Sequence, residues 1–284
     1  MIDEARGRPN SMRITIYHNP ACGTSRNALA LIRHFGIEPR IVEYVRNPPS
    51  RTELSAILVK AGLSPRQAVR KKETIFAELD LETAGDETLL DAMVAHPILI
   101  NRPLVVAGDA AALCRPSDVV LDLLPPMAVA DALKEEGAPI LKDARIDAND
   151  AGLIAALTEA KLPTDDLGEP GRTFYAYRSL AGATLGYGGY ELYGADAFLR
   201  SVVVAPKVRG RRIGRNLVPL LLYRAYRQGA RTAWLLTVTA ADFFAKIAFH
   251  RRPRTEAPAA ILETREAKSL CPVSAVLLSK TIGF

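Results

Sequence analysis

Cysteine and histidine are scarce in this sequence, and their spacing excludes two classes of protein. The 284 residues include three cysteines and four histidines, all widely separated. An odd number of distant cysteines does not suit a disulfide framework and is typical of a reducing compartment. Neither residue type shows the spacing of zinc ligands. The sequence therefore predicts a cytoplasmic protein without a bound metal.

Long apolar runs are also missing. No stretch approaches the ~18 residues that a membrane-spanning helix needs, so we expect no membrane contact. The opening residues, MIDEARGR, are charged and lack the apolar core of a secretory signal. We expect residues 1–11 to be a disordered lead-in.

The chain length and a proline pair together predict two domains. A chain of 284 residues exceeds the usual size of one domain. The run LLPP at residues 123–126 ends a helical pattern, because proline cannot continue a helix and restricts the residue before it. We expect one α/β domain over residues 12–125, a linker over 126–139 and a second α/β domain over 140–284.

Charge is distributed unevenly between the two parts. Residues 1–139 carry 16 Lys and Arg against 18 Asp and Glu, whereas residues 140–284 carry 21 against 13. The positive excess predicts an anionic partner for the second part. Because no aromatic-interleaved basic segment or nucleic-acid module is recognisable there, we expect a phosphorylated cofactor rather than nucleic acid.

Apolar periodicity and turn residues predict a β-α-β-α start for the first part and a mostly β second part. In the first part the pattern gives strands at 13–17, 39–44, 103–106 and 110–114, and helices at 24–35, 52–61, 64–70, 73–79, 86–95 and 116–123. In the second part it gives strands at 140–146, 172–178, 183–193, 197–205, 233–238, 258–263 and 273–280, and helices at 151–157, 216–228 and 240–247.

The most informative residue is Cys22, which lies between a predicted strand and a predicted helix in the run HNPACGTSRN at residues 18–27. At a helix N-terminus, free backbone N–H groups and the helix dipole favour thiolate over thiol. The same N–H groups bind oxyanions, so one loop can activate a nucleophile and hold an anionic substrate beside it. A buried, inert cysteine is the alternative, although the polar neighbours of Cys22 argue against it.

Residues 13–124 resemble the glutathione- and glutaredoxin-dependent arsenate reductases, whose fold is thioredoxin-like. The resemblance is carried by HNPACGTSRN, by VRKKE at 69–73, by LINRPLVV at 99–106 and by CRPSDVVL at 114–121. It implies that the Cys22 thiolate attacks the arsenic of arsenate while three arginines hold the oxyanion: Arg70, Arg102 and Arg115. It further implies glutathione as co-substrate and glutaredoxin as the partner that resolves the mixed species.

Five residues beside Cys22 are predicted to bind substrate or tune the pKa of the thiol: His18, Gly23, Thr24, Ser25 and Arg26. His18 either lowers the pKa or orders the loop, or it only closes the turn. Ser25 and Arg26 hydrogen-bond the sulfur or cap the helix, and we favour capping for at least one of them. Cys114 is expected to pack as a small apolar side chain.

Spacing around Cys22 argues against two related mechanisms. A phosphatase-like reductase needs arginine six positions after the cysteine, where this chain has Ala28. A thioredoxin dithiol needs a second cysteine at the position of Ser25. We therefore expect Cys22 to depend on an external thiol.

Residues 140–280 resemble the Gcn5-related N-acetyltransferase superfamily through the run VVAPKVRGRRIGR at 203–215 and the run ADFFAKIAF at 241–249. In that superfamily the first run holds the pyrophosphate of coenzyme A; stacked backbone N–H groups at a helix start suit this task. The resemblance implies acetyl-coenzyme A as cofactor, an amine acceptor that is not identified, and these cofactor-binding residues: Val203, Val204, Val208, Arg209, Gly210, Arg211, Arg212, Ile213, Gly214 and Arg215.

The second part departs from the superfamily pattern at two glycine positions. Arg212 and Ala248 stand where glycine is usual. At Arg212 the added Cβ crowds the pyrophosphate if the position needs close approach or a positive φ. The frequent tyrosine acid has no obvious counterpart at Phe243 or Phe244. Three carboxylates are weak candidates for a base, each more typical of a solvated surface: Glu191, Asp242 and Glu256.

The sequence as a whole predicts an arsenate reductase domain followed by an acetyltransferase-like domain linked to arsenic resistance. Two alternatives remain open for the first domain: a monothiol glutaredoxin-like enzyme and a regulatory module of the same fold without chemistry. For the second domain, the alternative is a coenzyme A-binding domain without catalysis.

Overall fold

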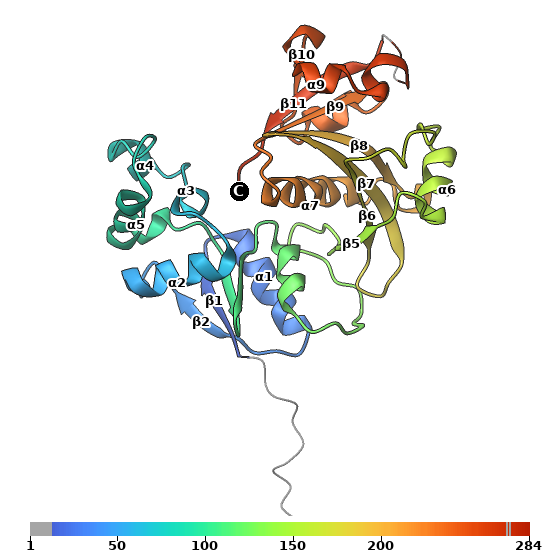
Figure 1. Cartoon of the computed structure of the whole chain (residues 1–284). Coiled ribbons are helices and arrows are strands. Elements are labelled where there is room, and N and C mark those ends of the chain that lie inside the picture. Colours follow the sequence, from blue (N-terminus) through green and yellow to red (C-terminus); the bar gives the residue numbers. More distant parts are fainter. Residues whose placement is uncertain (1–12, 271, 273) are drawn as a thin grey trace, which may run out of the picture. The chain divides into compact units, whose positions relative to one another are not determined.

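The computed structural model describes residues 13–270, 272 and 274–284. The chain divides into two compact units between Met127 and Ala128 (Figure 1). The predicted lead-in lies outside the described residues, and so does Cys271, the third cysteine of the sequence. From Ala128 onward, the segment predicted as a linker belongs to the second unit, where the buried Lys134 ammonium donates to Asn216 Oδ1. Among the described residues, no helix has the length and apolarity to cross a membrane.

The first unit is built on a four-stranded sheet in the order β2-β1-β3-β4. Strand β1 (Ile14–His18) pairs in parallel with β2 (Arg40–Glu43), which requires a crossover, and α1 (Gly23–His34) supplies it. Strands β3 (Leu104–Ala107) and β4 (Ala110–Leu113) form an antiparallel hairpin beside β1.

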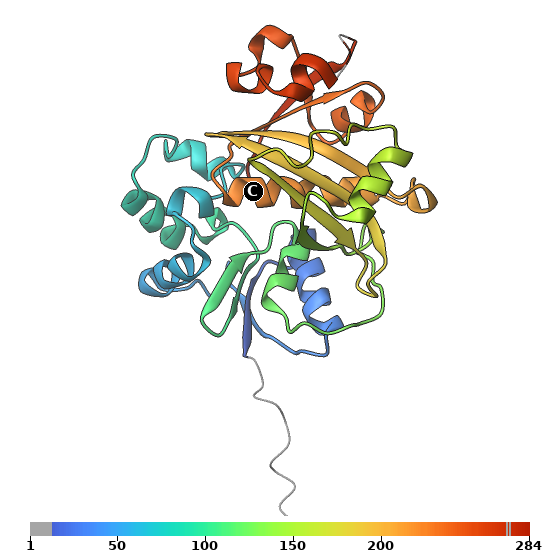
Figure 2. The ribbon, with the colours of Figure 1, turned by 45° about the vertical axis from the view of Figure 1, so that its right-hand side comes forward.

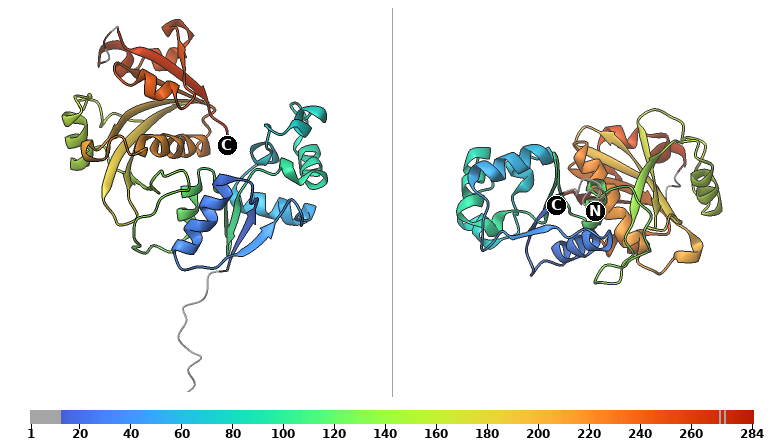
Figure 3. Two further views of the ribbon diagram at one scale, coloured as in Figure 1. Left: turned by 180° about the vertical axis from the view of Figure 1, so that it is seen from behind. Right: turned by 90° about the horizontal axis from the view of Figure 1, so that it is seen from below.

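Short helices complete the first unit. Ser50 caps α2 (Arg51–Ala61) by accepting a hydrogen bond from the Glu53 N–H, and Ser64 forms a capping box with Gln67 at the next helix. Helix α1 packs with η2, the 3₁₀ helix Ser117–Leu123, and α2 packs with α5 (Asp86–Ala95) and β4 (Figure 3). The remaining helices are α3 (Pro65–Ala68), α4 (Thr74–Glu78) and the 3₁₀ helix η1 (Pro97–Leu99).

The second unit is built on a seven-stranded sheet in the order β10-β11-β9-β8-β7-β6-β5. All neighbours are antiparallel except β8 and β9, which are parallel. The strands are β5 (Lys142–Ile146), β6 (Arg172–Arg178), β7 (Thr184–Tyr193), β8 (Asp196–Val204), β9 (Thr232–Thr237), β10 (His250–Arg252) and β11 (Val276–Thr281).

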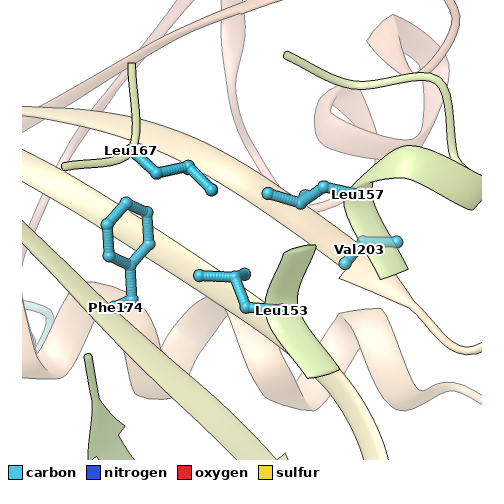
Figure 4. Close-up of a cluster of buried hydrophobic side chains, with 5 residues drawn as sticks. All are labelled: Leu153, Leu157, Leu167, Phe174 and Val203. Carbon is cyan, nitrogen blue, oxygen red and sulfur yellow. The ribbon is translucent and has the colours of Figure 1, made fainter. Parts of the chain in front are cut away.

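Two helices cover opposite faces of this sheet. Helix α7 (Ile213–Arg227) runs along one face, where Gly188 lets Leu217 and Leu221 approach the strand (Figure 2). Helix α6 (Ala151–Glu159) lies on the other face. Its side chains form a buried hydrophobic cluster with residues of β6, β8 and the loop before β6 (Figure 4): Leu153, Leu157, Leu167, Phe174 and Val203.

Strands β8 and β9 stay paired over only three residues each, from Asp196 to Phe198 in β8 and from Thr232 to Trp234 in β9. Farther along β8, Ser201 has a φ of 54°, and the register between β7 and β8 shifts at this level. Such a bulge bends a strand and ends its regular pairing. The end of this pairing leaves the later residues of β8 and β9 free to line a cavity.

Three sequence predictions need correction in the second unit. The predicted strand at 258–263 is wrong, since this run contains the helix α9 (Ala259–Leu262). Ile261 belongs to the hydrophobic cluster around Trp234 and Leu262 packs against it, whereas Ala259 and Ala260 are exposed, which suits one face of a helical turn. Strand β10 was not predicted, because all three of its side chains are exposed. The helix predicted at 216–228 begins earlier, at Ile213.

Candidate functional sites

Cys22 lies immediately before the first turn of α1, at the helix N-terminus that the sequence predicts. It is the N-cap residue, and its N–H donates to the Asn19 carbonyl at 3.0 Å, which closes the loop after β1. The side chain is partly buried. The prediction that Ser25 or Arg26 caps the helix is wrong, because α1 has no side-chain cap and Arg26 donates to the Pro20 carbonyl at 2.6 Å.

The surroundings of Cys22 favour its thiolate. Burial raises the pKa of the thiol, but the Ser25 N–H and hydroxyl, the Arg115 guanidinium and the Thr24 N–H outweigh it and lower the pKa to about 7. Arg115 places Nη1 4.0 Å from the Cys22 sulfur. A large fraction of the thiol is therefore ionised at neutral pH.

The three predicted arginines come together in the structure. Burial and the positive charges of Arg70 and Arg102 lower the pKa of Arg115, while the Cys22 thiolate acts in the opposite direction. Arg102 is buried, and its Nη1 donates to the Ile98 carbonyl at 3.1 Å. Guanidinium groups of this kind suit the oxygens of a tetrahedral anion.

Glu73 is the residue of this site that sequence reasoning missed. Its Oε1 accepts hydrogen bonds from Arg70 Nε at 2.6 Å and from Arg102 Nη1 at 3.0 Å. Burial raises the pKa of Glu73, but these two arginines outweigh it and hold the pKa below its ordinary value. Its place directly after the basic run VRKK was the only available signal.

His18 is buried at the end of β1. Burial lowers the pKa of its imidazole, so the ring is largely neutral at pH 7 and supplies no positive charge to the thiolate. An ordering role for the loop stays a prediction. Gly23 and Thr24 form the first turn of α1 with Ser25, as expected from the sequence.

Two buried polar atoms at this end of the first unit have no hydrogen-bond partner, namely His18 Nδ1 and Arg102 Nε. Buried polar groups are normally paired, so unpaired ones indicate a place where a polar ligand is accommodated. The prediction for Cys114 is confirmed: this thiol is fully buried, and burial raises its pKa well above the ordinary value. Within the described residues no cluster of three or more His, Cys, Asp or Glu could hold a metal ion.

The second unit contains a cavity of about 610 Å³ beside the start of α7. Apolar walls come from β8 and from α8 (Ala241–Ala245), and the first turn of α7 closes one end. Gly214 keeps the turn close to the ring of Phe243, because a Cβ at Gly214 would lie 2.9 Å from that ring. Eight predicted cofactor-binding residues line the cavity: Val204, Val208, Arg209, Gly210, Arg212, Ile213, Gly214 and Arg215.

Two predicted cofactor-binding residues do not line this cavity. Val203 points to the opposite face of the sheet, where its side chain packs with Leu157 of α6 (Figure 4). The period of two in a strand explains this, since the neighbouring Val204 faces the cavity. Arg211 is exposed and lies outside the lining.

Arg212 and Ala248, which replace glycine of the superfamily pattern, both adopt left-handed backbone. Their φ angles are 62° and 65°. A side chain at such a position costs about 1 kcal/mol relative to glycine. The sequence departs from the pattern at these positions, but the backbone keeps the conformation that the glycines would provide.

Replacing Ala248 with glycine is expected to raise the free energy of unfolding of the second unit by about 0.5–1 kcal/mol, because the left-handed strain disappears. Ala248→Gly can be measured by urea unfolding with the fluorescence of the single tryptophan, Trp234, which lies in the second unit. The matched control is Ala245→Gly in α8, which should destabilise by about the same amount. A lower free energy of unfolding in Ala248→Gly than in wild type would show that the backbone at Ala248 is not strained.

A second cavity of about 420 Å³ lies where β8 and β9 no longer pair. Its lining includes Arg200 of β8 and the buried Glu266, which begins the one-turn π-helix η5 (Glu266–Leu270). Burial raises the pKa of Glu266 to about 7, although Arg200, 3.5 Å away, acts against it. Sequence reasoning missed Glu266, because a glutamate in a polar run gives no sign of burial.

The three carboxylates singled out as candidate bases have different environments. Glu191 is buried, so the expectation of a solvated surface position is wrong for it; its Oε1 accepts hydrogen bonds from Arg172 and Arg200. Asp242 and Glu256 are exposed, as expected. Neither Glu191 nor these two lines the cavities beside β8 and α7.

Comparisons with known proteins separate the chain in the same way as the structure. A model of the ArsC family matches residues 17–123, and a model of the acetyltransferase (GNAT) family matches residues 140–254. The expected fold class, a thioredoxin-like α/β domain followed by an N-acetyltransferase-like α/β domain, is confirmed.

Curated relatives match the first part. An arsenate reductase of Rhizobium meliloti is 61% identical over 132 residues, which are 46% of this chain and 94% of the relative. An arsenate reductase of Acidiphilium multivorum is 50% identical over 133 residues, with the same two coverages. For the second part, the solved structure of a GNAT-family acetyltransferase from Staphylococcus aureus is 16% identical with a TM-score of 0.39, and the match covers 49% of this chain and 99% of that one. The Rhizobium relative is matched over nearly its whole length, and this chain therefore belongs to the ArsC family, with a GNAT acetyltransferase domain in its second half.

Proposed function

We propose that the first unit reduces arsenate to arsenite. The observation that carries this proposal is the position of the Cys22 sulfur at the start of α1. Arg115 Nη1 lies 4.0 Å from this sulfur, and the pKa of the Cys22 thiol is lowered to about 7. Arsenate resembles phosphate in shape and charge, and helix N-termini and guanidinium groups bind such anions. The curated relatives of this part are named arsenate reductases.

In the proposed reaction the Cys22 thiolate attacks arsenic(V), and one arsenate oxygen leaves as water after protonation. Arg70, Arg102 and Arg115 neutralise the charge of the remaining oxygens as the sulfur–arsenic bond forms. Two electrons from two thiols then reduce arsenic(V) to arsenic(III), and the thiols leave as a disulfide. The sulfur of Cys22 is free again when arsenite departs.

The reaction needs thiols from outside the described part of the chain. Cys114, the other cysteine that the structure describes, is fully buried and has a raised pKa, so it cannot attack the adduct. Glutathione is the proposed co-substrate whose thiol attacks the adduct. Glutaredoxin then supplies the second thiol, which attacks the glutathione sulfur, so that the two leave together as a mixed disulfide. Both are components of the cytoplasm, where we place the protein.

A coupled assay of the full chain tests this function. Protein, arsenate, glutathione and glutaredoxin should yield arsenite, and each of the two thiol components should be required. A glutaredoxin-like enzyme would consume thiols without arsenate, and a regulatory module would consume none. Either result would overturn the proposal.

We infer that the second unit binds acetyl-coenzyme A. Three arginines at the cavity beside α7, Arg209, Arg212 and Arg215, supply positive charge next to the free N–H groups of the first helical turn. This arrangement suits a pyrophosphate, and the apolar walls suit the pantetheine arm. Calorimetric titration of the full chain with acetyl-coenzyme A should give measurable heat; no heat would overturn the inference.

We also infer that the second unit transfers the acetyl group to an amine and that Glu266 accepts the ammonium proton. Glu266 faces the cavity between β8 and β9, and its pKa of about 7 is close to the operating pH, which a general base requires. A domain that only binds coenzyme A would not need a carboxylate at this place.

The raised pKa of Glu266 predicts a pH-dependent stability. The unfolded carboxyl ionises near its ordinary pKa and the folded one at about 7, so wild-type stability falls as pH rises between these values. The free energy of unfolding of Glu266→Gln relative to wild type should therefore be higher at pH 8 than at pH 5, by on the order of 2 kcal/mol. Urea unfolding followed through Trp234 measures this. The control Glu263→Gln removes an exposed carboxylate, so its stability relative to wild type should not change in this way between pH 5 and pH 8. If the two variants behave alike, Glu266 is not a buried carboxyl with a raised pKa.

A further inference from the structure

The arginine cluster of the first unit includes an acidic side chain, Glu73, that pairs with Arg70 and Arg102. Glu73 uses a single oxygen, Oε1, to accept from both Arg70 and Arg102. Arg102 is fixed further by the Ile98 carbonyl, and its Nε remains buried without a partner. A carboxylate oxygen that joins two guanidinium groups holds both in one geometry, so the arginines are ordered before any anion arrives.

The charge of Glu73 also matters for the anion. The three guanidinium groups and the Cys22 thiolate together carry a net charge of +2, and the Glu73 carboxylate lowers it to +1. Because these side chains are partly buried, solvent screens this charge less than it would at the surface. An anion entering the cluster meets two opposite effects of Glu73: ordered donors, which help binding, and a negative charge, which weakens it.

We propose that Glu73 is a positioning residue that orders Arg70 and Arg102 and, through its charge, limits the affinity of the site for tetrahedral oxyanions. This rests on the proposed arsenate chemistry, but it concerns the binding of anions and is testable without turnover. The position allows two substitutions that separate the effects. Glu73→Gln keeps an acceptor oxygen and removes the charge, whereas Glu73→Ala removes both.

The first measurement is the protection of Cys22 from iodoacetamide by inorganic phosphate in the full chain. Glu73→Gln should lower the half-protecting phosphate concentration at least about threefold, because a repulsive charge is gone. Glu73→Ala should raise it relative to Glu73→Gln by at least about threefold, because the arginines lose their common acceptor. In both variants, the pH dependence of alkylation should show a lower Cys22 pKa than in wild type.

The matched control is Glu82→Gln, which removes an exposed carboxylate paired with Lys71 in the same unit. It should leave both the half-protecting concentration and the Cys22 pKa unchanged. The proposal is overturned if Glu73→Gln behaves like Glu82→Gln, or if Glu73→Gln and Glu73→Ala give the same protection.

The arsenate assay adds a second, separate readout. Glu73→Gln should lower KM for arsenate, and Glu73→Ala should raise it relative to Glu73→Gln. If wild type reduces no arsenate, the proposed function fails, yet the phosphate protection and the Cys22 pKa still decide the role of Glu73. If arsenate is reduced and the Glu73 variants match wild type in all readouts, only the role of Glu73 fails.

Discussion

Replacing Cys22 with serine is expected to lower the rate of arsenate reduction at least about 10³-fold, because a serine hydroxyl is not ionised at neutral pH and cannot replace the thiolate. The groups that lower the thiol pKa, above all the Ser25 N–H and the Arg115 guanidinium, remain in place in Cys22→Ser. Phosphate should therefore still bind, as a thermal shift of the full chain can show.

The matched control is Cys114→Ala, which removes the other cysteine that the structure describes. Cys114 is buried and donates weakly to the Ala112 carbonyl, so its loss should reduce stability slightly and leave most of the activity. Arsenite formation by Cys22→Ser at a rate close to wild type would contradict a covalent step on this sulfur.

Replacing Arg200 with leucine is expected to destabilise the second unit by about 3–5 kcal/mol. The Arg200 guanidinium donates to Asp166 at 2.8 Å and to Glu191, and all three side chains are buried. In Arg200→Leu these carboxylates lose a cation that they share, and a buried charge without its partner is costly. Arg172 remains bound to both but cannot replace the lost donors.

The effect of Arg200→Leu can be measured by urea unfolding followed through Trp234. Arg265→Leu is the control, since Arg265 pairs with Glu169 at 3.2 Å in an exposed position and should change the stability by less than about 1 kcal/mol. Equal stabilities of the two variants would mean that the buried network does not support the unit.

The cluster of Cys22 and three arginines in the first unit could be predicted in its main parts. The strand, loop and helix around Cys22 are local in sequence, so periodicity and spacing place the thiol at a helix start. The three arginines came from a family resemblance, and the structure brings them together. Glu73 was not predictable as a member, because its hydrogen bond with Arg102 joins residues 29 positions apart.

In the second unit, more of the candidate site became visible only in the tertiary structure. The basic turn before α7 was evident, and so was the unusual arginine at 212, but only the structure shows that its φ is positive. Glu191 was expected at the surface and is buried among arginines. Its burial depends on Arg172 and Arg200 of two other strands, and no local pattern contains that information.

The sequence alone determined the two-part organisation, the position of Cys22 at the start of α1 and the basic turn before α7, because each depends on neighbouring residues and their periodicity. The tertiary structure decided which charged side chains are buried together, namely Glu73 with its two arginines and Glu266 beside Arg200. The physical reason is that the cost of burying a charge depends on partners that distant segments supply.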